Sequence, residues 1–126
     1  MRILGQGLAF LRGSLIPERE PTTFLQADAS MVIAVLTVEY HLHGNDSLKG
    51  KRRVANSLKQ KVRNTFNVAV AEYGTEDSLT RLRLMVISLS NSQQHLQSRM
   101  DKCLAMMEAV CSEEMVYSDL EFINGD

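Results

Sequence analysis

Apolar and polar residues alternate along the segment Met31 to Leu42, MVIAVLTVEYHL. Every even-numbered position in it is apolar, whereas the odd-numbered positions are apolar at Ile33 and Val35 and polar from Thr37 onward. A period of two with many β-branched residues predicts a strand. One face of this strand is expected to be buried along its whole length, and the other face over its first half only.

After Ser47 the period changes from two to about four. Val54, Leu58 and Val62 recur every four residues, which is the spacing of one helical face. Ser47 is a favourable N-cap, so we expect a helix from Ser47 to about Asn64.

The rest of the chain predicts three more strands and one more helix. Apolar segments at 66–72 and 79–89, separated by a turn at 73–78, predict two strands. Asn91 and Gln94 resemble a capping box, which predicts a second helix that ends near Val110. A last strand is expected at 115–123.

The order strand–helix–strand–strand–helix–strand predicts an α+β, ferredoxin-like βαββαβ sandwich. Its four-stranded antiparallel sheet would carry both helices on one face, with the first and third strands in the centre. The open face would then be polar at one end, where Glu39 and His41 lie near Arg81 and Arg83. At its other end the open face would be apolar, through Ile33, Val35, Met85, Ile87 and Leu89.

Length and composition predict one folded domain at 31–126. Residues 1–30 contain both prolines and little periodicity, so we expect a flexible N-terminal extension, or a translation start upstream of the natural one. Its apolar run is interrupted by Gln6 and two glycines, which is not typical of a secretory leader.

No apolar run reaches the length of a membrane span. Cys103 and Cys111 would lie about 12 Å apart on one helix, too far for a disulfide. Both would then be free thiols, as in a reducing compartment, and we therefore expect a cytoplasmic protein.

Positive charge is concentrated in one segment although the formal net charge is −1. Half of the 14 Lys and Arg residues lie between Lys49 and Arg63, with no acidic residue among them, while residues 108–126 contain six acids and no Lys or Arg. Five of these cations project opposite the apolar face of the predicted helix: Lys49, Arg52, Arg53, Lys59 and Arg63. They form either a solvated face or a surface for a polyanion, whose counterions binding would release.

Lys51 differs from these cations because its helical angle coincides with the apolar face. Two interpretations follow: a buried stem with its head directed to the sheet edge, or a small anion site formed with Ser47 and the first amides of the helix. A phosphate-binding P-loop is excluded, because the spacing of Gly44 and Gly50 is wrong and Arg52 replaces the magnesium-binding Ser or Thr.

Other chemistry finds little support in the sequence. Glu39, His41 and His43 share a strand face, but at about 7 Å spacing and with no carboxylate cluster to complete a set, so we expect no metal and no cofactor. No nucleophile–base pair is visible, and no enzyme activity is expected. The central strands contain a single aromatic residue, Tyr40, expected to face the core, which argues against base stacking on the sheet.

The strand MVIAVLTVEYHL, the run SLKGKRRV (Ser47 to Val54), the run RNTFNV (Arg63 to Val68) and the later VISLSNS resemble the YlxP-like family of small bacterial proteins. The resemblance extends over roughly 31–123 and implies a ferredoxin-like domain of unknown function. Members are often encoded beside translation initiation and ribosome maturation factors, which implies an RNA-linked role. Gly50 departs from the family, which commonly has an acidic residue there.

Our main hypothesis is a non-enzymatic accessory protein that binds ribosomal or other structured RNA through the basic helix. One alternative is a homodimer, or a protein-interaction module whose helix meets an acidic protein. The apolar end of the open face would then be covered by a second copy, or else by the N-terminal extension. Another alternative is a small-anion-binding regulatory domain that uses Ser47 and Lys51.

Overall fold

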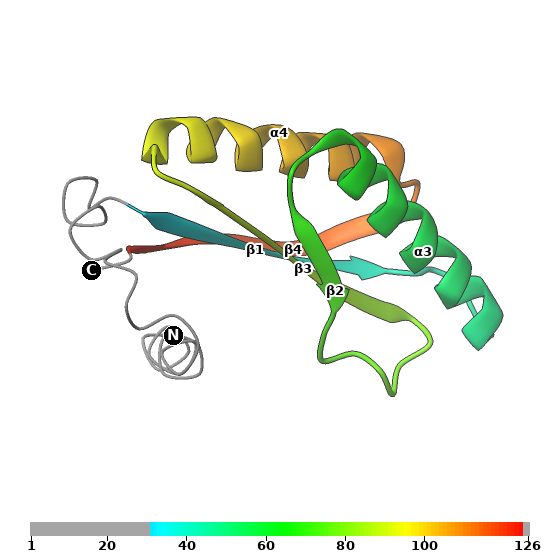
Figure 1. Ribbon diagram of the computed structural model, residues 1–126. Helices are drawn as coiled ribbons and strands as arrows, with labels where there is room; N and C mark the ends of the chain where they lie inside the picture. The colour runs from blue at the N-terminus through cyan, green and yellow to red at the C-terminus, as the bar shows by residue number, and fades with distance from the viewer. Residues whose placement is uncertain (1–30, 125–126) are drawn as a thin grey trace, which may run out of the picture.

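The structure is a computed structural model of the 126-residue chain and describes residues 31–124. The expected N-terminal extension at 1–30 lies outside the described residues. Six elements follow one another along the chain (Figure 1). They are β1 (Val32–His41), α3 (Leu48–Thr65), β2 (Ala69–Glu72), β3 (Arg81–Ser90), α4 (Gln93–Val110) and β4 (Glu114–Asn124).

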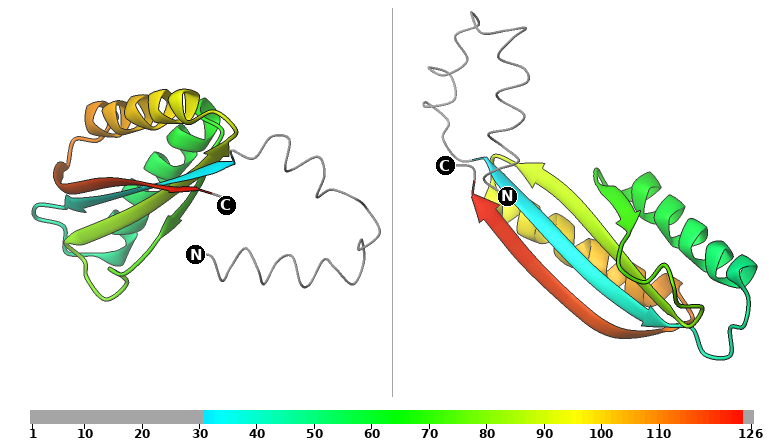
Figure 2. Two further views of the ribbon diagram at one scale, coloured as in Figure 1. Left: turned by 90° about the vertical axis from the view of Figure 1, so that its left-hand side faces the viewer. Right: turned by 90° about the horizontal axis from the view of Figure 1, so that it is seen from below.

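The four strands form one antiparallel sheet in the order β2-β3-β1-β4. Both helices lie on the same face of this sheet, and the other face is open when seen from below (Figures 1 and 2). The element order and the strand order together are those of the ferredoxin-like α+β fold. The prediction of this fold, with β1 and β3 central, is confirmed.

The register between β1 and β3 confirms the predicted pairing on the open face. Ile33 lies opposite Leu89, and Val35 lies opposite Ile87. At the other end Glu39 lies opposite Arg83. Strand β4 pairs with the opposite edge of β1, and its register shifts between Glu39 and Tyr40.

The core lies between the covered face of the sheet and the two helices. All even-numbered positions of β1 are buried, as the alternation predicted. The buried apolar side chains from the helices are Ala55, Leu58 and Val62 of α3, with Leu96, Met100, Cys103 and Met107 of α4. Together they cover the apolar face of the sheet, and such burial is the main favourable contribution to folding.

Tyr40 faces this core, as predicted, and its hydroxyl group donates a hydrogen bond of 3.0 Å to the carbonyl oxygen of Met107. Burial removes the phenol from water and raises its pKa above the ordinary value.

Burial also raises the pKa of the Cys103 thiol to about 11. Cys103 and Cys111 are unpaired thiols, as expected from their spacing.

The starts of α4 and β2 differ from those predicted, and other element boundaries differ by at most two residues. Ser92, not Asn91, caps α4, because the Ser92 hydroxyl accepts from the His95 amide at 3.2 Å. Strand β2 begins at Ala69 rather than at Phe66, because the chain turns where the Val68 amide donates to the Phe66 carbonyl.

Among the described residues, neither helix combines the length and apolarity needed to cross a bilayer.

Candidate nucleic-acid interface and the open face of the sheet

The solvent face of α3 carries the predicted basic residues. Lys49, Arg53 and Arg63 are exposed and Lys59 is half-buried. Within residues 31–124, no carboxylate lies within ion-pair distance of these four side chains. Arg52 is different, since its guanidinium group pairs with the Glu72 carboxylate of β2 at 2.9 Å. On this face, away from the core, α3 therefore presents four cations that have no acidic partner among residues 31–124.

Lys51 lies inside the protein and does not belong to this basic face. Only 3% of its surface is exposed. Its ammonium group donates to the carbonyl oxygens of Thr75 and Ser78, the latter at 2.5 Å. These bonds replace the water that a buried cation loses. Lys51 thus connects the first turn of α3 to the loop between β2 and β3.

The start of α3 is closed by side chains of its own loop. The Ser47 hydroxyl accepts from the Gly50 amide at 3.0 Å. The Asn45 side-chain amide donates to the carbonyls of Ser47 and Leu79, at 2.9 and 2.7 Å. Both side chains of the alternative anion site at Ser47 and Lys51 are thus engaged within the protein, and the burial of Lys51 agrees with the other interpretation, a buried stem with its head directed to the sheet edge.

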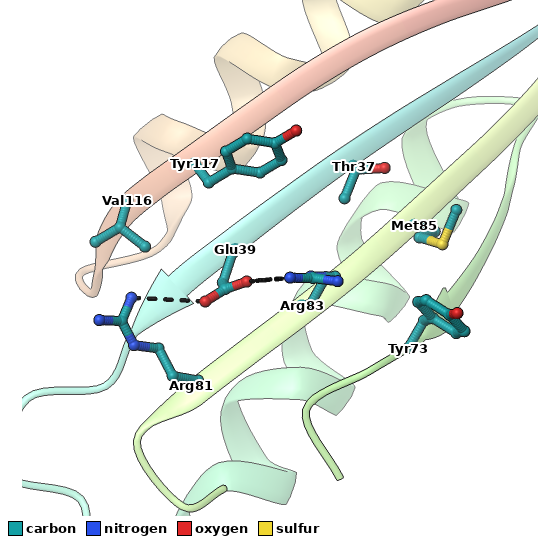
Figure 3. Close-up of a pocket in the computed structure, with 8 residues that line it drawn as sticks. All are labelled: Thr37, Glu39, Tyr73, Arg81, Arg83, Met85, Val116 and Tyr117. Carbon is teal, nitrogen blue, oxygen red and sulfur yellow. Dashed lines mark hydrogen bonds and ion pairs between the residues drawn. The ribbon is translucent and has the colours of Figure 1, made fainter.

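A charge network occupies the polar end of the open face (Figure 3). Glu39 of β1 lies between two arginines of β3: it accepts a hydrogen bond from Arg83 Nε at 3.1 Å and forms an ion pair with Arg81 at 3.5 Å. The pairing of Glu39 with these arginines was predicted from the strand register and is confirmed. It leaves the two guanidinium groups partly neutralised.

Two tyrosines border this network, and sequence reasoning missed their position. Tyr117 of β4 and Tyr73 from the loop after β2 line, with the charged residues, a shallow hollow of about 500 Å³ (Figure 3). The central strands contain no exposed aromatic ring, as expected. The rings come instead from an edge strand and a loop, and the alternation of Tyr117 with Asp119 along β4 was the available signal.

The other end of the open face is apolar. Ile87 is 43% exposed and Leu89 is 55% exposed. Ile33 and Met85 are half-buried, and Val35 is buried. Four of the five residues predicted to form an apolar patch lie at this end, whereas Met85 lies opposite Thr37 and also lines the charged hollow.

A carboxylate whose position the sequence analysis did not predict lies beside His41, the last residue of β1, and His43, which follows the strand. Glu114, at the start of β4, accepts a 2.7 Å hydrogen bond from His43, which is the main reason why the pKa of this carboxyl is lowered. From the sequence, Glu39 was the only carboxylate considered beside His41 and His43, whereas β4 supplies Glu114, 71 residues after His43.

Negative charge gathers at the edge of the sheet opposite the basic helix. Helix α3 packs against β2 at one edge, whereas β4 forms the other edge (Figure 2). Glu114, Asp119 and Glu121 are exposed along β4. The two edges thus carry charges of opposite sign, which orients a charged partner even at a net charge near zero.

The fold and the surfaces define a small ferredoxin-like α+β domain with one basic helix face. Residues 33–119 match the family described as "Protein of unknown function (DUF503)", so the chain belongs to this family. It is similar to "Uncharacterized protein YlxP" of Bacillus subtilis (strain 168), with 27% identity over 78 residues, which covers 62% of this chain and 85% of that protein.

A solved structure, "Structural Genomics, protein YJCS", is also similar to the chain. It is 11% identical with a TM-score of 0.45, and the match covers 73% of this chain and 99% of that one. The fold assignment rests on the sheet order itself.

Proposed function

We propose that the protein is a non-enzymatic accessory protein that binds structured RNA, ribosomal RNA in the first place, through the solvent face of α3. The observation that carries this proposal is a set of four cations on one side of an 18-residue helix, none of which pairs with an acid in the described part of the chain: Lys49, Arg53, Lys59 and Arg63. From Lys49 to Arg63 the axial distance is about 21 Å, which is enough to contact several phosphates.

The distribution of charge along α3 supports a binding role over a solvated surface. The first turn of the helix contains no acidic residue and carries Lys49, where a cation opposes the helix dipole. Like charges at helical spacing also destabilise a helix. An RNA backbone would relieve both effects, and the release of its counterions would drive association.

The acidic edge at β4 would keep the same RNA from binding in other orientations. Phosphates are repelled by Glu114, Asp119 and Glu121 and attracted by α3 at the opposite edge. An RNA-associated role also places the protein in the cytoplasm, where two unpaired thiols such as Cys103 and Cys111 are ordinary.

Co-sedimentation with ribosomal particles at low and high salt tests the proposal, followed by titration of a ribosomal RNA fragment. We expect the logarithm of the affinity to fall with the logarithm of salt concentration, by about 0.7 to 0.9 per phosphate contact. The variant Arg53→Glu with Arg63→Glu should weaken binding at least tenfold and flatten the slope. Because both side chains are exposed, the variant should fold normally.

Lys102→Glu is the matched control for Arg63→Glu. Lys102 is exposed on α4, and the two substitutions change the net charge equally. The proposal requires that Arg63→Glu weaken binding while Lys102→Glu leaves it nearly unchanged. Equal losses in both variants would show that only net charge matters, and no loss in either would exclude α3 as the RNA surface.

As a second candidate function we propose self-association through the apolar end of the open face. The specific observation is the exposure of Ile87 and Leu89 beside Ile33 and Met85 on the open face of the sheet. Adjacent exposed apolar side chains are typical of interaction sites. A second copy would present the same residues, so that the two faces complement each other.

A further inference from the structure

Three potential metal ligands meet where β1 ends and β4 begins. His41 is the last residue of β1 and lies opposite Glu114, the first residue of β4, in the strand register. His43 follows two residues later, just before Gly44 turns the chain with a φ of 75°. Two imidazoles and one carboxylate thus come from three positions that the fold brings to one corner of the molecule.

The three side chains are already close enough to share one ion. One ligand atom from each lies within 4.8 Å of the other two. His43 Nε2 and Glu114 Oε1 are 2.7 Å apart. The rings of His41 and His43 lie side by side, with centroids 3.9 Å apart and planes tilted by 39°.

We propose that His41, His43 and Glu114 bind a divalent transition-metal cation, with Zn²⁺ as the best match, and leave the fourth position open to water. Two imidazoles with one carboxylate form a ligand set that Zn²⁺ uses in proteins. Mg²⁺ and Ca²⁺ fit poorly, because they prefer oxygen ligands in larger number. This proposal is independent of RNA binding by α3.

The side chains need only small movements to reach bonding geometry. Zn²⁺ binds nitrogen and oxygen at about 2.0–2.2 Å, so tetrahedral ligand atoms lie about 3.3 Å apart. The present separations range from 2.7 Å, about 0.6 Å below that value, to at most 4.8 Å, about 1.5 Å above it. The side chains of His43 and Glu114 are 60% and 59% exposed, and so they can rotate without disturbing the core.

A structural explanation of the same geometry is a surface ion pair between His43 and Glu114. Such exposed pairs contribute little to stability. Breaking the pair between His43 and Glu114 to bind a metal therefore costs little free energy. The neighbouring cation, Arg81, would disfavour a metal, but its guanidinium group is directed to Glu39 at 3.5 Å. The pairing with Glu39 therefore reduces the repulsion between Arg81 and a metal cation bound at this corner.

The experiment is a titration of the full chain, without any histidine tag, with ZnCl₂ by calorimetry. We expect one site per chain, and we expect the thermal unfolding midpoint to rise with Zn²⁺ because only the folded state assembles the ligands. His41→Gln and His43→Gln should each weaken binding at least tenfold and abolish the thermal shift. Glu114→Gln should weaken binding as well.

His95→Gln is the matched control, since His95 is exposed on α4 and is the third and last histidine of the chain. It should bind Zn²⁺ as the unaltered protein does. The proposal is overturned if micromolar Zn²⁺ gives no saturable binding, or if the double variant His41→Gln with His43→Gln binds undiminished. A thiolate charge-transfer band with Co²⁺ would overturn it too, because the metal would then be bound by cysteine.

Discussion

The ammonium group of Lys51 in α3 donates a 2.5 Å hydrogen bond to the carbonyl oxygen of Ser78, 27 residues later in the chain. The same group also binds the carbonyl of Thr75. One buried cation therefore holds the loop after β2 against the first turn of the basic helix. Its contacts are structural, whereas Lys49 and Arg53 beside it are exposed.

Replacing Lys51 by Met keeps the length of the stem and removes the charge. We expect the free energy of unfolding to fall by about 2–3 kcal/mol, because two partly buried carbonyl groups lose a charged partner. Urea denaturation measures the loss. Lys49→Met, at an exposed position two residues earlier, is the control and should change stability by less than about 0.5 kcal/mol. Equal stability of the two variants would mean that the loop is held by other contacts.

Ile87→Glu tests self-association through the open face. Ile87 is 43% exposed on the central strand β3, and a carboxylate there would be desolvated in any dimer that buries this face. We expect the unaltered chain to elute as a dimer and the variant as a monomer, measured by size-exclusion chromatography with light scattering. Val110→Glu, at an exposed apolar residue of α4, is the control. An unchanged mass for Ile87→Glu would exclude the sheet face as the interface.

Stability should decrease at alkaline pH because of Cys103. Burial raises the pKa of this thiol from 9.0 to about 11, so between these values the folded state keeps a proton that the unfolded state has lost. The free energy of unfolding should therefore fall as pH rises from about 9 to about 11, by about 2–3 kcal/mol in total. Tyr40, whose pKa is also raised, adds to the decline above pH 10.

Denaturation series at several pH values between 7 and 11 measure this dependence. Cys103→Ala should lose part of the alkaline decline, although its stability at pH 7 will be lower because of the missing sulfur atom. Cys111→Ala is the comparison, as Cys111 is only half-buried. The explanation fails if Cys103→Ala retains the full pH dependence. A thiol reagent should also modify Cys111 before Cys103 in the native protein.

Local patterns were sufficient to predict the architecture. The alternation from Val32 to Leu42 defined the buried face of β1, and that face fixed the register, since a slip by one residue would expose it. Pairing of Glu39 with Arg83 then followed from the topology. The exposure of Lys49, Arg53 and Arg63 followed from helical periodicity alone.

The features that were missed depend on contacts between distant segments. Nothing near Lys51 in the sequence indicates that the carbonyls of Thr75 and Ser78 will surround it, because a loop's backbone direction is not encoded in its hydrophobic pattern. Glu114 meets His43 only through the pairing of β1 with β4, which includes a register shift. Contacts of this kind can be predicted only after the pairing and register of the strands are known.

The edges of the sheet determine how copies of this protein can associate. Strand β2 is four residues long, and beyond it the Tyr73 amide and the Thr75 hydroxyl bind the backbone of Arg83. At the other edge, charged side chains line β4. Short or charged edges resist the addition of further strands. Face-to-face pairing about a twofold axis is closed at two copies, so a concentrated solution of this protein should stay free of fibrils.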